Sequence, residues 1–323
     1  MTPFAYYRAQ DAADALASAG PHTAFLAGGT DLLPLHRIGI AVPEKVIDIS
    51  RLALQGVDVS AAGIVIGAAS RMRDVASNPL ILAQFPVISQ SLLASASPQI
   101  RNVATLGGNL LQRTRCAYFR SSDLSCNKRT PGSGCGARDG YNRAHALFGT
   151  SPHCVATHPS DLAVALVALD ARVELRSVGG DRKVALEDFY RLPEHQPDRD
   201  TIIDPRELLI AIEVPAWDGP SSYVKVRDRA SFEFAVVSVA AALRIEAGKV
   251  RAARLCAGGV GTRPWRLRDC EAALQGQPAG DVSFRMAARH AGGGAAVLGH
   301  NDFKIDLLEV TVVRALHNAF GAV

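Results

Sequence analysis

Four of the six cysteines in this 323-residue chain lie in a single stretch of sequence. The stretch is CAYFRSSDLSCNKRTPGSGCGARDGYNRAHALFGTSPHC, which begins at Cys116, contains Cys126 and Cys135, and ends at Cys154. Its glycine, serine and proline content is typical of a turn-rich loop. Four thiols in one loop can form disulfides, hold a structural zinc ion or ligate an iron–sulfur cluster.

The three chemistries make different demands on spacing and context. Disulfides are disfavoured, because nothing marks the chain as secreted by itself and a large domain does not need covalent cross-links. Structural zinc sites usually carry paired C-x-x-C motifs, and this chain contains no C-x-x-C. An iron–sulfur cluster also needs four thiolates but tolerates varied spacing. Spacing alone therefore leaves zinc and iron–sulfur open.

Two glycine pairs have the composition of phosphate-binding loops. The segment FLAGGTDLL spans Phe25–Leu33, and RNVATLGGNLL spans Arg101–Leu111. Consecutive glycines let successive backbone N–H groups converge on an anion, and a following helix N-terminus adds favourable partial charge. Either loop alone is more often a tight turn, but two similar loops favour a diphosphate site. Neither matches the Rossmann or P-loop pattern.

Hydrophobic periodicity predicts the elements that must position these loops. In the first two thirds, we expect strands at Thr23–Ala27, Lys45–Ile49, Gly63–Ala68, Arg172–Ser177 and Glu207–Val214, and helices at Asp11–Ala19, Asp31–Arg37, Val87–Ala96 and Asp161–Asp170. Residues Pro215–Pro220 have the composition of a linker. After it we expect strands at Ser222–Arg227, Ala235–Ile245 and Val250–Ala257, then helices near Arg266–Leu274, Ser283–Ala291 and Leu307–Ala319. This order predicts an α+β terminal domain.

Length and composition limit the class of protein. A chain of 323 residues suggests two or three domains, and a net charge of +4 gives no argument for a nucleic-acid partner. The longest apolar stretches, Leu162–Leu169 and Ala235–Leu243, fall short of the ~20 residues of a membrane helix. The N-terminal sequence has no signal-peptide pattern. We therefore expect a soluble protein without a membrane partner, either cytoplasmic or exported to the periplasm with a partner that carries the signal.

Several motifs together resemble one family. LAGGTDLL, RNVATLGGN, HPSDLA and YVKVRDRASFEFAVVSVAAAL occur in the order found in the flavoprotein (medium) subunit of the xanthine dehydrogenase and molybdenum hydroxylase family. The later segment ARLCAGGVGTRPWRLRDCEAAL resembles the domain that ends these flavoproteins. The resemblance implies an α+β protein with a p-cresol methylhydroxylase-like FAD-binding domain over residues 1–218, in subdomains of about 1–55 and 56–218. A smaller α+β domain with an antiparallel sheet and helices would cover 219–323.

The resemblance also implies the FAD-binding residues. They are Leu26, Ala27, Gly28, Gly29, Thr30, Asp31, Leu32, Thr105, Gly107, Gly108, Asn109, Asp161 and Lys225. The two glycine loops would hold the pyrophosphate, Asp161 would bind the adenosine side, and Lys225 would lie near the flavin ring, where reduced flavin carries negative charge. Without the resemblance, Asp161 is more simply the N-cap of its helix and Lys225 a solvated strand residue.

The cysteine stretch is an insertion relative to most members of the family. This cysteine insertion, about residues 112–157, resembles the insert of periplasmic aldehyde oxidoreductase flavoproteins and, more distantly, that of hydroxybenzoyl-CoA reductases. The resemblance implies a [4Fe–4S] cluster ligated by Cys116, Cys126, Cys135 and Cys154. Gly132, Gly134 and Gly136 would then approach the cluster and donate N–H bonds to its sulfides.

The insertion is also basic, with seven Lys or Arg against two Asp between Arg113 and Arg143. A basic surround would lower the cost of burying an anionic cluster. The same residues would also suit docking of an acidic electron carrier, or form an ordinary solvated surface. Cys256 and Cys270 are expected to be buried free thiols, and His158 a packing residue beside the flavin rather than a ligand.

The resemblance implies an electron-transfer role within a heterotrimer. A large partner with a molybdenum cofactor would oxidise an aldehyde, and a small partner with two [2Fe–2S] clusters would pass the electrons to FAD on this chain. The flavin would deliver them to an external acceptor, for example a ferredoxin-like protein, and no substrate-oxidising residue would lie on this chain. The alternatives are the medium subunit of a xanthine dehydrogenase-like or hydroxybenzoyl-CoA reductase-like enzyme, and a non-enzymatic, zinc-stabilised interaction module.

Overall fold

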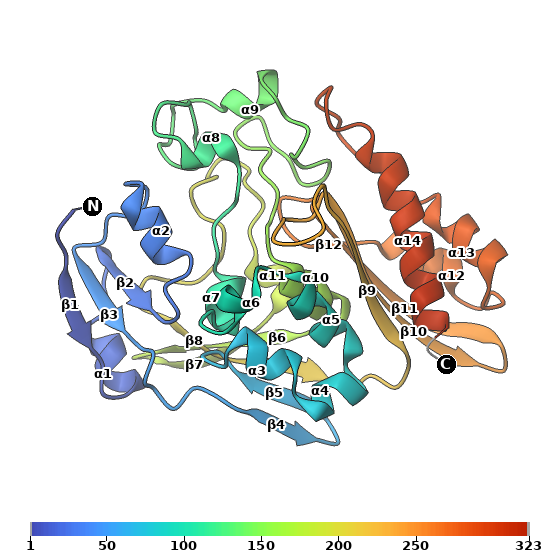
Figure 1. Cartoon of the computed structure of the whole chain (residues 1–323), viewed down its shortest axis with the longest axis horizontal. Helices are drawn as coiled ribbons and strands as arrows, with labels where there is room; N and C mark the ends of the chain where they lie inside the picture. The colour runs from blue at the N-terminus through green and yellow to red at the C-terminus, as the bar shows by residue number, and fades with distance from the viewer. Residues whose placement is uncertain (1, 322–323) are drawn as a thin grey trace.

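The computed structural model describes residues 2–321 and contains three β-sheets side by side (Figure 1). The first sheet is parallel, with strand order β1-β3-β2. Its strands are β1 (Ala5–Arg8), β2 (Thr23–Leu26) and β3 (Lys45–Asp48), connected through α1 (Ala12–Ala17) and α2 (Leu32–Arg37). The first glycine loop is the turn between β2 and α2, as the sequence predicts.

The second sheet is antiparallel, with strand order β4-β5-β8-β6-β7. Its strands are β4 (Val57–Ser60), β5 (Gly63–Gly67), β6 (Arg172–Ser177), β7 (Gly180–Ala185) and β8 (Leu208–Pro215). The helices of this region are α3 (Met72–Ala76), α4 (Pro79–Gln84), α5 (Pro86–Ala94), α6 (Pro98–Arg101), α7 (Leu106–Leu110), α10 (Asp161–Ala168) and α11 (Leu186–Phe189). All eight residues of α10 are buried, which explains why the seven that follow Asp161 are apolar.

The third sheet is antiparallel and lies between two layers of helices (Figure 1). Its strand order is β12-β11-β10-β9, with β9 (Ser221–Val226), β10 (Val237–Glu246), β11 (Lys249–Gly258) and β12 (Trp265–Arg266). One face carries α12 (Arg268–Leu274), α13 (Asp281–Ala288) and α14 (Lys304–Phe320), and α5 and α10 pack on the other.

The central strand β10 is buried on both faces, and its alternate residues join two different cores. Ala240 and Ala242 belong to the core that contains α5 and α10, whereas Val239, Ala241 and Leu243 belong to the core that contains α14. This double burial explains why the strand reads as a continuous apolar run. The fold is therefore α+β, with the third sheet packed firmly against the preceding domain.

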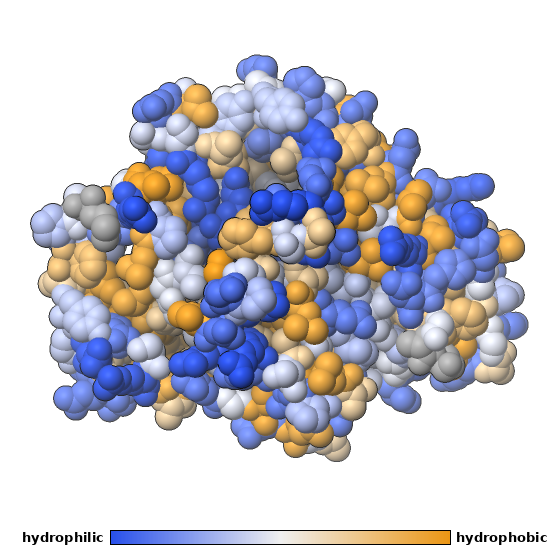
Figure 2. All heavy atoms as spheres, viewed as in Figure 1, coloured by the Kyte–Doolittle hydropathy of each residue, from blue (hydrophilic) through white to orange (hydrophobic). Residues whose placement is uncertain are grey.

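The cysteine insertion lies above the three sheets and contains little regular structure (Figure 1). Its two short helices are α8 (Ala117–Arg120) and α9 (Gly136–Asp139). A backbone bridge between Phe148 and Gly261 ties the end of the insertion to the chain between β11 and β12. Hydrophilic residues gather beneath it on the face shown in Figure 2.

The expected elements are present with ends that differ from the prediction by at most three residues, whereas the strands β1, β4, β7 and β12 and the short helices were not predicted. The helices α3, α4, α6 and α7 have four to six residues each, too few to show a helical period. Cys256 and Cys270 are fully buried free thiols, which confirms that expectation. No helix in residues 2–321 is both long enough and apolar enough to cross a membrane.

Candidate cofactor-binding site

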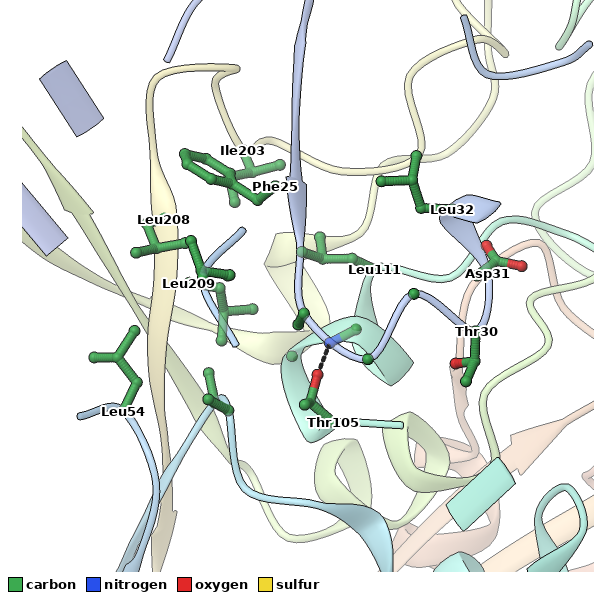
Figure 3. Close-up of a pocket in the computed structure, with 18 of the residues that line it drawn as sticks. Phe25, Thr30, Asp31, Leu32, Leu54, Thr105, Leu111, Ile203, Leu208 and Leu209 are labelled. Atoms are coloured by element: carbon green, nitrogen blue, oxygen red, sulfur yellow. Dashed lines mark hydrogen bonds between the residues drawn. The ribbon is translucent and has the colours of Figure 1, made fainter. Parts of the chain in front are cut away.

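Two cavities of about 330 Å³ each meet at the glycine loops. The first, the apolar cavity, is lined by four segments, 25–54, 68–69, 105–113 and 203–209, with side chains that include Phe25, Leu54, Leu111, Ile203, Leu208 and Leu209 (Figure 3). The second, the polar cavity, is lined among others by Met72, Ile100, Asn109, Asp161, Lys225 and Phe232. Thr30, Asp31 and Gly108 line both. The pair of cavities therefore forms one elongated site with the glycine loops at its middle.

The first glycine loop offers a row of unused hydrogen-bond donors. Within the described chain, the five successive backbone N–H groups of Gly28 to Leu32 have no protein acceptor. Gly28 is required by a close backbone approach, because a Cβ there would lie 2.2 Å from the carbonyl oxygen of Val103. Gly29 has a φ of +70°, which favours glycine. Successive free N–H groups beside a cavity are the arrangement that binds a phosphate.

The second glycine loop contributes differently from what its sequence suggests. The N–H of Gly107 donates to the Ala68 carbonyl at 2.8 Å, and the N–H of Gly108 donates to Thr105 Oγ1 at 3.2 Å (Figure 3). The expectation that both loops present free N–H groups is therefore wrong for these glycines. A Cβ at Gly108 would meet only Thr105 Oγ1 within 4 Å, and Gly108 faces both cavities. This loop provides space for a ligand rather than donors.

Asn109 also has a structural partner. Its side-chain oxygen accepts a hydrogen bond of 2.6 Å from Ser160 Oγ, and Ser160 caps the N-terminus of α10. Of the other residues expected to bind the cofactor, Ala27 and Leu32 line the apolar cavity, whereas Leu26 lines neither cavity.

A buried ion pair closes the end of the polar cavity. Lys225 Nζ lies 2.8 Å from Asp161 Oδ2, and both side chains are about 5% exposed or less. The Asp161 carboxylate also accepts from Ser95 Oγ at 2.9 Å and from the Tyr223 hydroxyl at 2.5 Å. Tyr223 and Lys225 are two positions apart on β9, so their side chains lie on the same face of the sheet. Both reach Asp161, the first residue of α10.

This pair corrects three expectations. Asp161 is not the N-cap of α10, because Ser160 has that role. Lys225 is not solvated. The two residues also cannot serve the adenosine and flavin ends of one extended dinucleotide, because they contact each other and line one cavity.

Tyr223 is a site residue that sequence reasoning missed. Burial and the negative charge of Asp161 hold the pKa of Tyr223 well above its usual value, so the phenol keeps its proton and donates a hydrogen bond to the carboxylate. The available signal was its spacing of two residues from Lys225, which predicts a common face of the strand.

Asp31 points to the cysteine insertion. Its carboxylate pairs with Arg115 at 2.8 Å and Arg120 at 3.1 Å, and accepts the backbone N–H of Arg113 at 2.8 Å. These three donors compensate the negative charge of the Asp31 carboxylate. Asp31 thus links the first glycine loop to the insertion, which was not expected from the sequence.

The four clustered cysteines come together in the fold. Cys116, Cys126, Cys135 and Cys154 all line one small enclosed space within the insertion. Cys126 and Cys135 are paired through a backbone bridge, and all four are free thiols. Burial raises the pKa of Cys116 to about 12 and also raises the pKa of Cys154, so both thiols are neutral at pH 7.

The spacing of the sulfurs bears on the choice of metal. Within residues 2–321, no three His, Cys, Asp or Glu side chains are close enough together to hold one metal ion. A zinc ion would need its sulfurs ~2.3 Å from a common centre. Four thiolates around a multi-iron core are further apart, since each binds a different iron. Cys126 and Cys154 are buried and Cys116 and Cys135 are partly exposed, so the four free thiols surround one space without the close grouping that a single zinc ion needs.

Each of the seven basic side chains of the insertion forms an ion pair or a hydrogen bond within this chain. Arg113 and Lys128 pair with Asp200, Arg115 and Arg120 with Asp31, and Arg143 with Asp228, while Arg129 and Arg138 donate to backbone carbonyls. They are therefore anchors of the loop, and neither a freely solvated surface nor an open docking patch describes them.

The insertion's glycines have conformational roles. Gly132 and Gly134 have φ of +87° and +89°. The N–H of Gly134 donates to Asn127 Oδ1 at 2.8 Å and that of Gly136 to the Ser125 carbonyl at 3.0 Å. The expectation that these two N–H groups serve a cluster is therefore wrong.

Two histidines lie near the cysteines. His158 packs edge-on against Tyr190, with ring centroids 4.4 Å apart, and burial lowers its pKa to about 4. It packs as expected but lines neither of the two cavities, so its place beside the flavin stays a prediction. His145 was not singled out by the sequence, yet its Nε2 lies 3.2 Å from Cys116 Sγ. The 29 residues of irregular chain between them gave no signal of this contact.

The cysteine space and the polar cavity share parts of the chain. Arg115, next to Cys116, lines the polar cavity, and so do Pro159 and Asp161 at the end of the segment that begins at Cys154. A cluster held by these thiols would therefore lie directly behind the wall of the polar cavity.

Comparison with known proteins gives matches over the whole chain. A family model described as the FAD binding domain in molybdopterin dehydrogenase matches residues 2–217, and one described as the CO dehydrogenase flavoprotein C-terminal domain matches residues 222–319. The aldehyde oxidoreductase FAD-binding subunit PaoB of Escherichia coli K12 is 43% identical over 99% of both chains. The glyceraldehyde dehydrogenase medium chain of Sulfolobus acidocaldarius is 28% identical over 86% of this chain and 83% of that one.

Solved structures agree with the fold. A chain of the carbon monoxide dehydrogenase from Hydrogenophaga pseudoflava superposes with a TM-score of 0.77 at 25% identity, covering 99% of both chains. A chain of quinoline 2-oxidoreductase from Pseudomonas putida 86 has a TM-score of 0.75 at 22% identity, with 98% of this chain and 97% of that one covered, and shows the same fold.

Proposed function

Since the chain belongs to the FAD-binding (medium) subunits of the molybdenum hydroxylase family, we propose that it is the FAD and [4Fe–4S] electron-transfer subunit of a molybdenum-dependent aldehyde oxidoreductase. The observation that carries the finer part of this proposal is the convergence of all four insertion cysteines on one enclosed space beside the polar cavity. The identity of 43% to an aldehyde oxidoreductase FAD-binding subunit supports the substrate class.

The two cavities suggest how FAD lies. The apolar cavity takes the adenine, the free N–H groups of Gly28 to Leu32 take the diphosphate, and the polar cavity takes the flavin ring. Lys225 then supplies positive charge to the ring, and Asp161 sets how much of that charge is neutralised. In this arrangement Thr105 and Gly108 lie beneath the diphosphate. Asn109 holds the start of α10 through its hydrogen bond with Ser160.

The cysteine insertion holds the second cofactor. Cys116, Cys126, Cys135 and Cys154 each supply one thiolate, and the internal guanidinium groups compensate part of the negative charge that four thiolates bring. Bound FAD supplies the ability to accept electrons singly and release them singly or in pairs. The protein's own residues would bind and orient both groups, and Arg115 and Cys116, adjacent in the chain, line the polar cavity and the cysteine space respectively.

The proposal extends to partners and domain limits. A large subunit with the molybdenum cofactor oxidises the aldehyde, a small subunit with two [2Fe–2S] clusters passes electrons on, and an external acceptor such as a ferredoxin-like protein receives them. The chain divides into residues 1–218, with subdomains at about 1–55 and 56–218, and residues 219–323. The extents of the three sheets and the ends of the two family matches support these limits.

The test is a cofactor analysis of the purified full chain. We expect a flavin absorption spectrum with a broad brown shoulder, one FAD and about four iron atoms per chain, and no stoichiometric zinc. The chain without partners should not oxidise aldehydes, and the assembled complex should. Zinc in place of iron would contradict the cluster, and aldehyde turnover by this chain alone would contradict the division of labour.

A further inference from the structure

The contact between His145 and Cys116 has no role in the site described so far. His145 Nε2 lies 3.2 Å from Cys116 Sγ. In the proposed site this sulfur would be deprotonated and would bind iron. Within the described chain, none of the other three insertion cysteines has a side-chain N–H group bonded to its sulfur. One ligand of the four is thus singled out by a polar contact.

The imidazole is held in place from the C-terminal domain. His145 is buried, and its carbonyl accepts hydrogen bonds from Lys304 Nζ at 3.1 Å and Asn301 Nδ2 at 3.4 Å. Its backbone N–H donates to the Asn142 carbonyl at 2.9 Å. Lys304 and Asn301 are themselves fully buried, so the position of His145 is fixed by residues that cannot move easily.

Within the described residues, the ring has one hydrogen-bond partner, Cys116 Sγ. A neutral imidazole carries a single N–H, on either Nδ1 or Nε2. Nδ1 is buried and has no hydrogen-bond partner in residues 2–321. If Nδ1 held the hydrogen, a buried donor would go unused and the Nε2 lone pair would face a thiolate. The hydrogen therefore belongs on Nε2, directed at the sulfur.

We propose that His145 donates an Nε2–H hydrogen bond to the Cys116 ligand and thereby raises the reduction potential of the proposed cluster. The inference rests on the proposed function. Four thiolates give a cluster a charge of about −2 when oxidised and −3 when reduced, and a donor stabilises the more negative state more strongly. His145 is a positioning residue that acts through Cys116, not a ligand and not a catalytic group.

Three substitutions test the donor. Gln carries its amide nitrogen at the same number of bonds from Cα as Nε2, whereas Asn carries it at the level of Nδ1. His145→Gln should therefore keep the bond, and His145→Asn and His145→Leu should lose it. The measurement is the midpoint potential of the cluster, from an electron paramagnetic resonance titration of the full chain, together with iron and flavin content.

We expect the Leu and Asn variants to shift the redox equilibrium roughly tenfold toward the oxidised cluster, which is ~59 mV for one electron. The Gln variant should stay near the parent, and the flavin potential should not move. Equal potentials in parent, Asn and Leu variants with full iron would overturn the inference while leaving the proposed function intact. Loss of iron in all three variants would also overturn it, because His145 would then be a ligand. If the Leu variant alone loses iron, the comparison of Gln with Asn decides. A parent without iron would instead contradict the proposed function itself.

Discussion

Arg115 and Asp31 are 2.8 Å apart and join the two parts of the protein that the sequence presents as separate. Asp31 ends the first glycine loop, and Arg115 immediately precedes Cys116. With Arg120 and the N–H of Arg113, this ion pair fixes the insertion to the loop that is expected to hold the FAD diphosphate. Order in one site is therefore coupled to order in the other.

Asp31→Asn should loosen both sites. The neutral amide leaves Arg115 and Arg120 without their shared counter-ion, which we expect to cost about 2–4 kcal/mol, since breaking a buried pair costs ~3–5. The measurements are FAD affinity and the rate of protease cleavage within residues 116–154. Asp228→Asn is the matched control, because its pair with Arg143 is exposed and should contribute ~1 kcal/mol or less. Equal effects of the two substitutions would show that Asp31 is not the link.

Gly108→Val should lower FAD binding and leave iron unchanged. A valine side chain at Gly108 would extend into the space where both cavities meet, and its Cβ would lie 3.1 Å from Thr105 Oγ1. We expect affinity to fall tenfold or more, ~1.4 kcal/mol. Gly20→Val is the control, since a Cβ there meets nothing within 4 Å and Gly20 lines neither cavity. Full flavin retention in Gly108→Val would remove the second loop from the site.

Asp161 and Lys225 should move the flavin potential in opposite directions. Lys225→Met removes a cation from the polar cavity and should lower the potential, because the reduced flavin anion loses its compensation. Asp161→Asn leaves the lysine charge unopposed and should raise it. The double variant should lie between the two. Spectroscopic redox titration of the bound flavin checks all three, and shifts of the same sign in both single variants would rule out this arrangement.

Cys126→Ser should remove the cluster, because a serine hydroxyl is rarely ionised and is a poor substitute for a thiolate. The insertion should then become protease-sensitive, while part of the flavin remains, since the glycine loops lie outside residues 116–154. Cys270→Ser makes the same change at a buried thiol of the third sheet's helices and should keep its iron. Parental iron and protease resistance in Cys126→Ser would mean that Cys126 is not a ligand.

Lys304 should make stability depend on pH. Burial lowers its pKa from 10.5 to about 7, so between about pH 7 and 10 the unfolded chain binds more protons than the folded one. The resulting penalty is complete below pH 7 and diminishes as the pH rises. The charged groups near Lys304 are Arg143, which lowers its pKa further, and Asp228, which opposes the shift.

The thermal midpoint of the parent should thus rise between pH 7 and 8.5 relative to Lys304→Met, whose side chain does not titrate. The exposed Lys249→Met variant should retain the parental slope. A parallel pH dependence in parent and Lys304→Met would show that Lys304 does not titrate in this range.

The sequence predicted the elements with clear periodicity but not the contacts that join them. The local sequence patterns of β9 and β10 predict a strand at each position, and the structure has both strands there. The two glycine loops look alike in sequence, yet Ala68 and Thr105 occupy the N–H groups of the second one only. Such differences depend on partners far along the chain, which no local pattern records.

The charged residues illustrate the same limit. Seven cations in the insertion suggested an interaction surface because their partners, Asp31, Asp200 and Asp228, lie outside it in the sequence. The ion pair of Asp161 with Lys225 joins residues 64 positions apart across two family domains. The residue types could be recognised from the sequence, but their pairing required the fold.

The double burial of β10 has a consequence for the order of events during synthesis. The core around α5 and α10 includes residues from Ile64 to Cys256, so these helices keep an apolar face uncovered until the third sheet has left the ribosome. The segment that carries His145 reaches its final position later still, because Lys304, which donates to the His145 carbonyl, is near the end of the chain. We therefore expect FAD, and the proposed cluster, to bind after translation is complete, and a chain that stops after residue 218 to expose the apolar face of α5 and α10.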